Sequence, residues 1–215
     1  MAINSATDIC NLALDLLSAG TVQNVVEPSS ATEELLNRWY DLCRKKCLRE
    51  HPWNFAAKRA VLSASSPSPT FGYAKAFPVP ADFVRILYLS TDLITDQETI
   101  MPSDQYQFEN GSILLSTNYG DASSVNLVYI YDITEVSRMD PLFIELLAYD
   151  IATSVAYKVT ENNSNIQRLG EILKQKASIA KAIDGQERPP QMVTRPRVLS
   201  SRLSSSTGNS HRVTF

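Results

Sequence analysis

The sequence is poor in the residue types that most often carry catalysis or bind cofactors. It has two histidines and seven glycines among 215 residues. The scattered glycines form neither GxxxxGKS/T nor GxGxxG, which excludes the common phosphate-binding loops. His51 precedes a helix-ending proline and His211 lies in a Ser/Arg-rich tail, so neither has the neighbours of a catalytic triad. We therefore expect no enzyme, no catalytic residue and no cofactor.

Cysteines are few as well. Cys10, Cys43 and Cys47 are odd in number and form no CxxC pair. Disulfide-stapled secreted domains have many cysteines, in an even number, so a reducing compartment is the simpler interpretation. Cys43, Cys47 and His51 are spaced by four on one expected helix and could face a metal ion, but zinc would need a fourth ligand, Cys10 or a carboxylate. Buried thiols are the favoured alternative, and no metal is expected.

Long apolar runs are also missing. No stretch approaches the roughly 18 apolar residues that a membrane span requires, so we expect no membrane anchor. The first 20 residues lack a basic start, and Asp8, Asn11 and Asp15 interrupt their apolar residues, which disfavours a signal peptide. The apolar fraction of 44% and the charged fraction of 20% are ordinary for a globular protein. The length suits one core with a subdomain.

Apolar residues recur at helical spacing in two segments within residues 1–52 and in two within residues 136–184. Gly20 is expected to end the first helix through a left-handed backbone, and Pro52 to end the second. The pair Asp140–Pro141 should start a third, mostly buried helix. The fourth should run from about Ser164 to Ile183, with Lys174, Lys176 and Lys181 toward its C-terminal end, where the helix dipole favours positive charge.

Residues 53–135 show a different pattern, with short β-branched and aromatic runs between Ser/Pro, Asp/Gln and Asn–Gly punctuation. Asn110–Gly111 predicts a tight hairpin turn, because both residues tolerate positive φ. The expected strands are Phe83–Leu89, Ile113–Ser116 and Val125–Tyr131, the last buried on much of both faces. The fold class is therefore α+β: an antiparallel α-helical bundle, with two N-terminal and two C-terminal helices, and an inserted antiparallel β subdomain.

Residues 185–215 are expected to form an extended basic C-terminal arm. They carry a net charge of +4, whereas the whole chain carries −3. Their Pro, Ser and Arg content suggests a solvated tail, yet apolar residues recur in them, which is typical of an arm that adds to a partner's surface as an extended strand. The arginines are compatible with nucleic-acid binding, and docking on an acidic protein groove is at least as well supported.

The segment from His51 to Leu89 contains a mixture that hydrophobic patterning does not demand. Trp53, Phe55 and Arg59 could form an Arg–aromatic anchor, but core packing of the two rings at the helix–sheet junction is the favoured interpretation. Asp82 is expected to cap a turn, and Arg85 is expected to form an ion pair with a carboxylate. The residues of this motif are Trp53, Phe55, Arg59, Tyr73, Pro78, Pro80, Asp82 and Arg85.

This motif closely resembles a segment of the tail tubular protein A family of short-tailed bacteriophages, and the similarity covers about residues 2–184. The resemblance implies a structural virion protein, a head-to-tail adaptor or connector in the tail or neck, assembled in the host cytoplasm. It implies a homo-oligomeric, dodecameric ring through which DNA passes without sequence-specific binding. The helical part would face the portal protein, and the β part would face the tail nozzle protein and possibly tail fibres.

Related connectors grip the portal with C-terminal arms, so the resemblance gives the arm a role. We expect it to insert between portal subunits, with apolar side chains filling pockets and arginines pairing with portal acids. The alternative is a nucleic-acid-binding regulatory protein that uses the same arginines. The expected portal-binding residues are Arg188, Arg195, Arg197, Val198, Leu199, Arg202, Leu203, Arg212 and Phe215.

Overall fold

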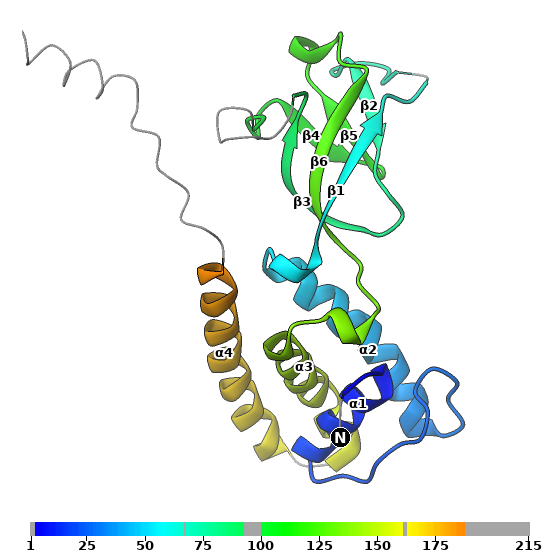
Figure 1. Ribbon diagram of the computed structural model, residues 1–215. Coiled ribbons are helices and arrows are strands. Elements are labelled where there is room, and N and C mark those ends of the chain that lie inside the picture. The colour runs from blue at the N-terminus through cyan, green and yellow to red at the C-terminus, as the bar shows by residue number, and fades with distance from the viewer. Residues whose placement is uncertain (1–2, 67, 93–99, 161–162, 188–215) are drawn as a thin grey trace, which may run out of the picture.

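The computed structural model describes residues 3–66, 68–92, 100–160 and 163–187 (Figure 1). These residues form a mixed α+β fold with four α-helices and two small antiparallel sheets, which confirms the expected class. The elements run in this order: α1 Ala6–Leu16, α2 Ala31–Glu50, η1 Asn54–Ala56, β1 Ala57–Ser63, β2 Lys75–Pro78, β3 Phe83–Ser90, β4 Tyr106–Glu109, β5 Ser112–Leu115, η3 Thr117–Tyr119, β6 Ser124–Tyr131, η4 Val136–Arg138, α3 Pro141–Thr160 and α4 Asn163–Gln186.

The first two helices begin with capping boxes. The Ser5 hydroxyl accepts from the Asp8 N–H, and the Asp8 carboxylate accepts from the Ser5 N–H at 2.9 Å. Ser30 and Glu33 repeat the arrangement at the start of α2. Each reciprocal pair satisfies backbone donors that a helix start leaves without partners.

The end of α1 differs from the prediction. The helix stops at Leu16, and Ser18 adopts the left-handed backbone (φ 56°) that was expected at Gly20. The cause is Asn11, whose side-chain amide bonds both the N–H and the C=O of Val22, at 2.8 and 3.0 Å. Because Val22 is held against α1 in this way, the chain must turn back before it reaches Gly20.

The β region consists of two three-stranded antiparallel sheets, ordered β1-β6-β3 and β2-β5-β4. The hairpin between β4 and β5 is confirmed, since Asn110 and Gly111 have φ of 46° and 70°. Strand β6 is central and mostly buried, as expected. The two sheets share an apolar cluster formed by Leu62, Phe77, Leu89, Met101, Ile113, Leu115, Val125, Leu127 and Tyr129.

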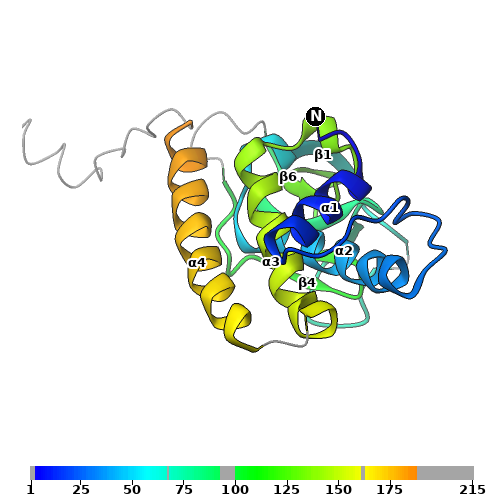
Figure 2. The same cartoon turned by 90° about the horizontal axis from the view of Figure 1, so that it is seen from below.

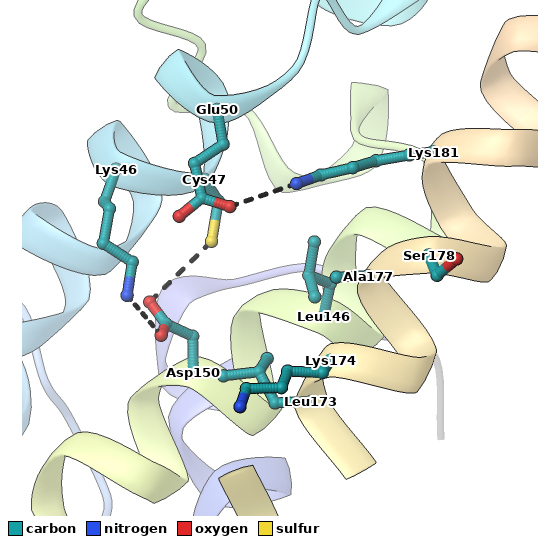
Figure 3. Close-up of a pocket in the computed structure, with 10 residues that line it drawn as sticks. All are labelled: Lys46, Cys47, Glu50, Leu146, Asp150, Leu173, Lys174, Ala177, Ser178 and Lys181. Atoms are coloured by element: carbon teal, nitrogen blue, oxygen red, sulfur yellow. Dashed lines mark hydrogen bonds and ion pairs between the residues drawn. The ribbon is translucent and has the colours of Figure 1, made fainter. Parts of the chain in front are cut away.

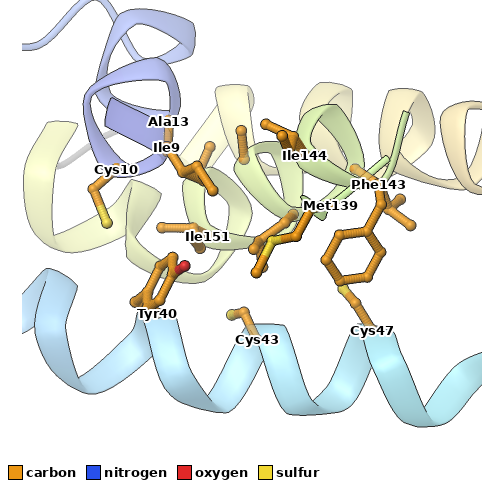
Figure 4. Close-up of a cluster of buried hydrophobic side chains, with 14 of the residues drawn as sticks. Ile9, Cys10, Ala13, Tyr40, Cys43, Cys47, Met139, Phe143, Ile144 and Ile151 are labelled. Carbon is orange, nitrogen blue, oxygen red and sulfur yellow. The ribbon is translucent and has the colours of Figure 1, made fainter. Parts of the chain in front are cut away.

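Helix α3 is the centre of the helical region and contacts α1, α2 and α4 (Figure 2). Asp140 caps it by accepting from the Leu142 N–H at 2.7 Å, which confirms the expected start at Pro141. Half of its 20 residues are buried, so the prediction of a mostly buried helix is also confirmed. Apolar side chains of α1 and α2 surround it (Figure 4). Helix α4 extends three residues beyond the expected end, to Gln186.

The buried carboxylate of Glu33, in the capping box at the start of α2, allows a direct test of helix capping. It accepts from the N–H of Ser29, from the Ser29 hydroxyl, and from the N–H groups of Asn24 and Gln23, which lowers its pKa from 4.5 to about 2. The stabilisation is present above the unfolded pKa and is lost as the pH falls from about 4.5 to 2.

We predict that Glu33→Gln lowers the free energy of unfolding at pH 7, and that its difference from the parent narrows steadily between pH 4.5 and 2. Urea unfolding across this pH range measures the difference. Glu34→Gln, at the neighbouring exposed position, is the control and should have little effect. A difference for Glu33→Gln that does not depend on pH would contradict the prediction.

Candidate functional site

The residues that carry the family resemblance lie mainly where the helical region meets the β region. Trp53 is fully buried, and its indole N–H donates to the Cys47 carbonyl at 2.9 Å. Its ring meets Phe143 edge-on at 5.2 Å between centroids and lies 6.0 Å from Phe55. Packing of Trp53 and Phe55 at the helix–sheet junction is therefore confirmed.

The alternative of an Arg–aromatic anchor is wrong for this motif. Arg59 is exposed on β1, and the ring contacts that the structure describes for Trp53 are with other aromatic residues. The preceding residue makes the cation–π contact instead, with Lys58 Nζ 5.2 Å from the ring centroid of Tyr131. Neighbouring strand residues point to opposite faces, so only one of the two basic side chains can lie over this ring.

Asp82 lies in the turn between Pro80 and Phe83, but its carboxylate does not cap that turn. It accepts from Lys58 Nζ at 2.6 Å and from the Tyr129 hydroxyl at 2.9 Å. Partial burial opposes its ionisation, but these two hydrogen bonds outweigh the effect and lower the pKa of Asp82. The carboxylate, one residue before β3, thus connects side chains of β1 and β6.

The expectation that Arg85 pairs with a carboxylate is wrong. Its guanidinium donates to the carbonyl of Arg49 at 2.9 Å, and Arg49 Nη1 donates to the carbonyl of Val84 at 2.8 Å. The last carbonyls of a helix have no intrahelical donors, and the end of α2 lies against β3. Arg85 supplies one such donor and ties the two elements together.

Tyr73 lies just before β2 of the other sheet, and Pro78 is the last residue of that strand. The Tyr73 hydroxyl donates to the side-chain carbonyl of Gln107 on β4, and Pro78 ends the edge strand β2, where a missing N–H is tolerated. The motif is therefore divided between the helix–sheet junction and the second sheet. It does not converge on one site.

A residue that the sequence analysis missed holds the junction together. The guanidinium of Arg44, only 2% exposed, bonds Asp132, the Ile133 carbonyl at 2.7 Å and Asp41 at 3.1 Å. Burial opposes its charge, but the two carboxylates outweigh this and raise the pKa of Arg44. Its only sequence signal is an arginine next to the apolar stripe of α2.

The three side chains considered for a metal point to different partners. Cys43 Sγ lies 3.7 Å from Ser154 Oγ, Cys47 Sγ lies 3.8 Å from Asp150, and His51 Nε2 lies 2.9 Å from Asp184. Within the described ranges, no group of three or more His, Cys, Asp or Glu could hold a metal ion. The interpretation of Cys10, Cys43 and Cys47 as buried thiols is confirmed.

A groove of about 430 Å³ lies between α2 and α4 with α3 as its floor (Figure 3). Its lining combines apolar side chains with three lysines and two carboxylates: Lys46, Cys47, Glu50, Leu146, Asp150, Leu173, Lys174, Ala177, Ser178 and Lys181. Burial raises the pKa of the Cys47 thiol, and pairing with Asp150 outweighs burial and raises that of Lys46. The groove thus presents charge and apolar surface, without an activated nucleophile or base.

The lysines of α4 act differently from the prediction. Lys176 Nζ lies 2.7 Å from Glu145 of α3, and Lys181 Nζ lies 3.3 Å from Glu50 of α2. Because α4 continues to Gln186, none of these lysines is in its last turn. Two of the three lysines, Lys176 and Lys181, therefore form ion pairs with neighbouring helices instead of interacting with the helix dipole.

Large apolar side chains are exposed on both parts of the molecule. Phe71, 86% exposed, precedes β2, with Phe108 on β4 and Val61 on β1. Others lie on or beside the helices: Val26, Leu42, Tyr157, Ile179 and Ile183. Single exposed apolar side chains are normal on a protein surface; these lie on both the helical region and the β region.

No protein-family model matches the chain, and no curated protein is similar to it. Within the described part of the chain, no helix is long and apolar enough to cross a membrane. All expected portal-binding residues fall within 188–215, outside the described residues. The candidate sites in the described part of the chain are therefore the junction, the groove and the exposed apolar positions.

We predict that the Trp53 side chain is essential to the helix–sheet junction. Trp53→Ala should lower the free energy of unfolding by about 3–5 kcal/mol, through lost burial and the cavity left behind. Arg59→Ala, at the exposed position of the same motif, should change it by about 0.5 kcal/mol or less. Chemical unfolding followed by circular dichroism measures both. Equal losses for the two variants would contradict the assignment.

We also predict that the three thiols are unreactive in the native protein. Burial raises the pKa of Cys10 and of Cys43 to about 12 and that of Cys47 as well, so little thiolate forms at pH 8. Titration with Ellman's reagent should detect no thiol before denaturation and three after it. Rapid reaction of any one of them in the folded protein would show that the core is open.

Proposed function

We propose that the protein is a head-to-tail adaptor subunit of a short-tailed bacteriophage. Copies would form a dodecameric ring between the portal and the tail nozzle, leaving a channel through which DNA passes. The helices would pack as an antiparallel bundle facing the portal, with the β sheets facing the nozzle and any tail fibres.

The observation that best supports this proposal is the division of the molecule. The helical region and the β sheets have separate apolar cores, and each carries exposed apolar side chains. A protein that joins two different assemblies needs contact surfaces at two ends. The sequence motif of Trp53 to Arg85 adds the resemblance to the adaptor family, and two of its residues, Trp53 and Arg85, hold the junction between the two regions.

The bonding at the junction is compatible with a rigid spacer. The chain crosses between the two regions after α2 and again after β6. Arg44 bonds the second crossing at Asp132 and Ile133, while Arg49 and Arg85 join the end of α2 to β3. Charge-assisted hydrogen bonds at both places restrict movement of one part against the other. A subunit that transmits load along a tail requires this property.

The proposal assigns portal docking to the arm predicted at 185–215, of which residues 185–186 form the end of α4 and residues 188–215 lie outside the described residues. A weak contact repeated around a closed ring is multiplied by avidity, so one arm need not bind tightly. The arm follows α4, whose C-terminal end lies at the helix–sheet junction, where Asp184 accepts from the Asn54 N–H at 2.8 Å and lies 2.9 Å from His51. Its arginines would pair with acidic portal side chains, and its apolar residues would occupy portal pockets.

Deletion of residues 188–215 tests this assignment. The truncated protein should fold normally, because both apolar cores lie within the retained residues, but should lose binding to the portal protein of the same phage. Pull-down and sedimentation with purified portal measure binding, and urea unfolding confirms the fold. A full-length variant with all five arm arginines changed to lysine keeps the charge and is the matched control. Unchanged docking of the truncated protein would refute the role of the arm.

A further inference from the structure

The C-terminal end of helix α4 is bonded to the rest of the molecule through one buried acid. Asp184 is 7% exposed, and its carboxylate accepts from the Asn54 N–H at 2.8 Å. The other carboxylate oxygen lies 2.9 Å from His51 Nε2, and the main-chain carbonyl of Asp184 accepts from the Asn54 side-chain amide at 2.6 Å. All three bonds run to the turn that joins α2 to β1. One residue of α4 thus contacts the helix–sheet junction at three points.

Little apolar packing supports this end of the helix. Within residues 179–186, which the structure describes throughout, the buried residues are Ala180 and Asp184. Alanine buries little apolar area, while Ile179 and Ile183 are 53% and 41% exposed. A groove of about 430 Å³ separates this part of α4 from α2 (Figure 3). Low apolar burial is typical of segments that open locally while the rest of a fold stays intact.

The ion pair between Lys181 and Glu50 is a second polar link between α4 and α2, at 3.3 Å (Figure 3). Its two side chains are 33% and 46% exposed. Solvent and salt screen an ion pair of this kind, so it contributes little to stability. The buried bonds of Asp184 are therefore the main polar attachment of the end of α4.

The position of Asp184 also opposes the local preference of a helix. Carbonyl groups without partners give the C-terminal end of a helix a partial negative charge, which favours lysine or arginine there and disfavours aspartate. Asp184 lies in the last turn of α4, this turn has no basic residue, and the acidic Glu187 follows it. The contacts with His51 and Asn54 must offset this local cost. Departures from local preference are expected at functional positions.

We infer that Asp184 is a latch for the last two turns of α4, residues 179–186. While its bonds to His51 and Asn54 are made, these turns stay against the body, and the predicted arm starts beside the junction. When the bonds break, the two turns separate from the body as a unit and the start of the arm moves with them. Opening changes the reach of the arm without unfolding either apolar core. The latch goes beyond the adaptor proposal, because it does not depend on which partner the arm binds.

Amide hydrogen exchange of the full-length protein, resolved by peptide mass spectrometry, tests the latch. Asp184→Ala should speed exchange in residues 179–186 roughly tenfold or more, because hydrogen bonds to a buried charge are lost. Exchange in α3 and β6 should stay as in the parent, because their buried side chains lie in the apolar cores. Asp184→Asn keeps the volume and one carbonyl oxygen. It should give a smaller increase in the same segment, and it carries the test if the alanine variant does not fold.

Glu187→Ala is the matched control, because it removes an exposed acid from the same helix end. The helix dipole alone predicts that both alanine variants slow exchange at the end of α4, whereas the latch predicts faster exchange for Asp184→Ala only. Equal exchange in the two variants overturns the inference. So does a uniform increase across α3, α4 and β6, because Asp184 would then support only global stability. None of these outcomes involves the portal, so failure of the adaptor proposal leaves the latch standing.

Discussion

The buried guanidinium of Arg44 is the interaction on which the two-part architecture depends. It lies on α2 and bonds Asp132 and Ile133, where the chain leaves β6 and returns to the helices. Removing one partner from such a buried pair leaves a charge without compensation, which is far more costly than the net value of the pair. Trp53, at the other crossing, fills the space between the same regions. The two crossings together fix how the sheets stand on the helices.

The helical region and the β sheets could otherwise move independently, because their apolar cores share few residues. A fixed junction makes them one spacer with a different surface at each end. The proposed connecting role rests on this arrangement, in which the exposed Phe71 belongs to the β part and the exposed isoleucines to α4. The groove between α2 and α4 combines apolar side chains with three lysines and two carboxylates, and two of the lysines, Lys46 and Lys181, are paired with those carboxylates.

Local signals predicted much of the fold. Asp140 and Asn110–Gly111 indicate a helix cap and a hairpin turn within a few residues, and the structure has both. Prediction failed where a distant side chain decides the outcome. Asn11 bonds Val22, so α1 ends earlier than predicted, and Arg85 bonds a backbone carbonyl in place of a carboxylate. Arg44 was missed because its partner Asp132 lies 88 residues away in the sequence. The groove was missed for the same reason, since three helices build it.

The most direct test of the adaptor proposal is the mass of the native full-length protein in solution, alone and after addition of the portal protein of the same phage. If the adaptor proposal is right, the protein alone has a mass near that of one chain, 23.9 kDa, and forms a ring when the portal is present. A protein that remains monomeric with the portal and binds DNA instead, with an affinity that falls steeply as salt is raised, would contradict it.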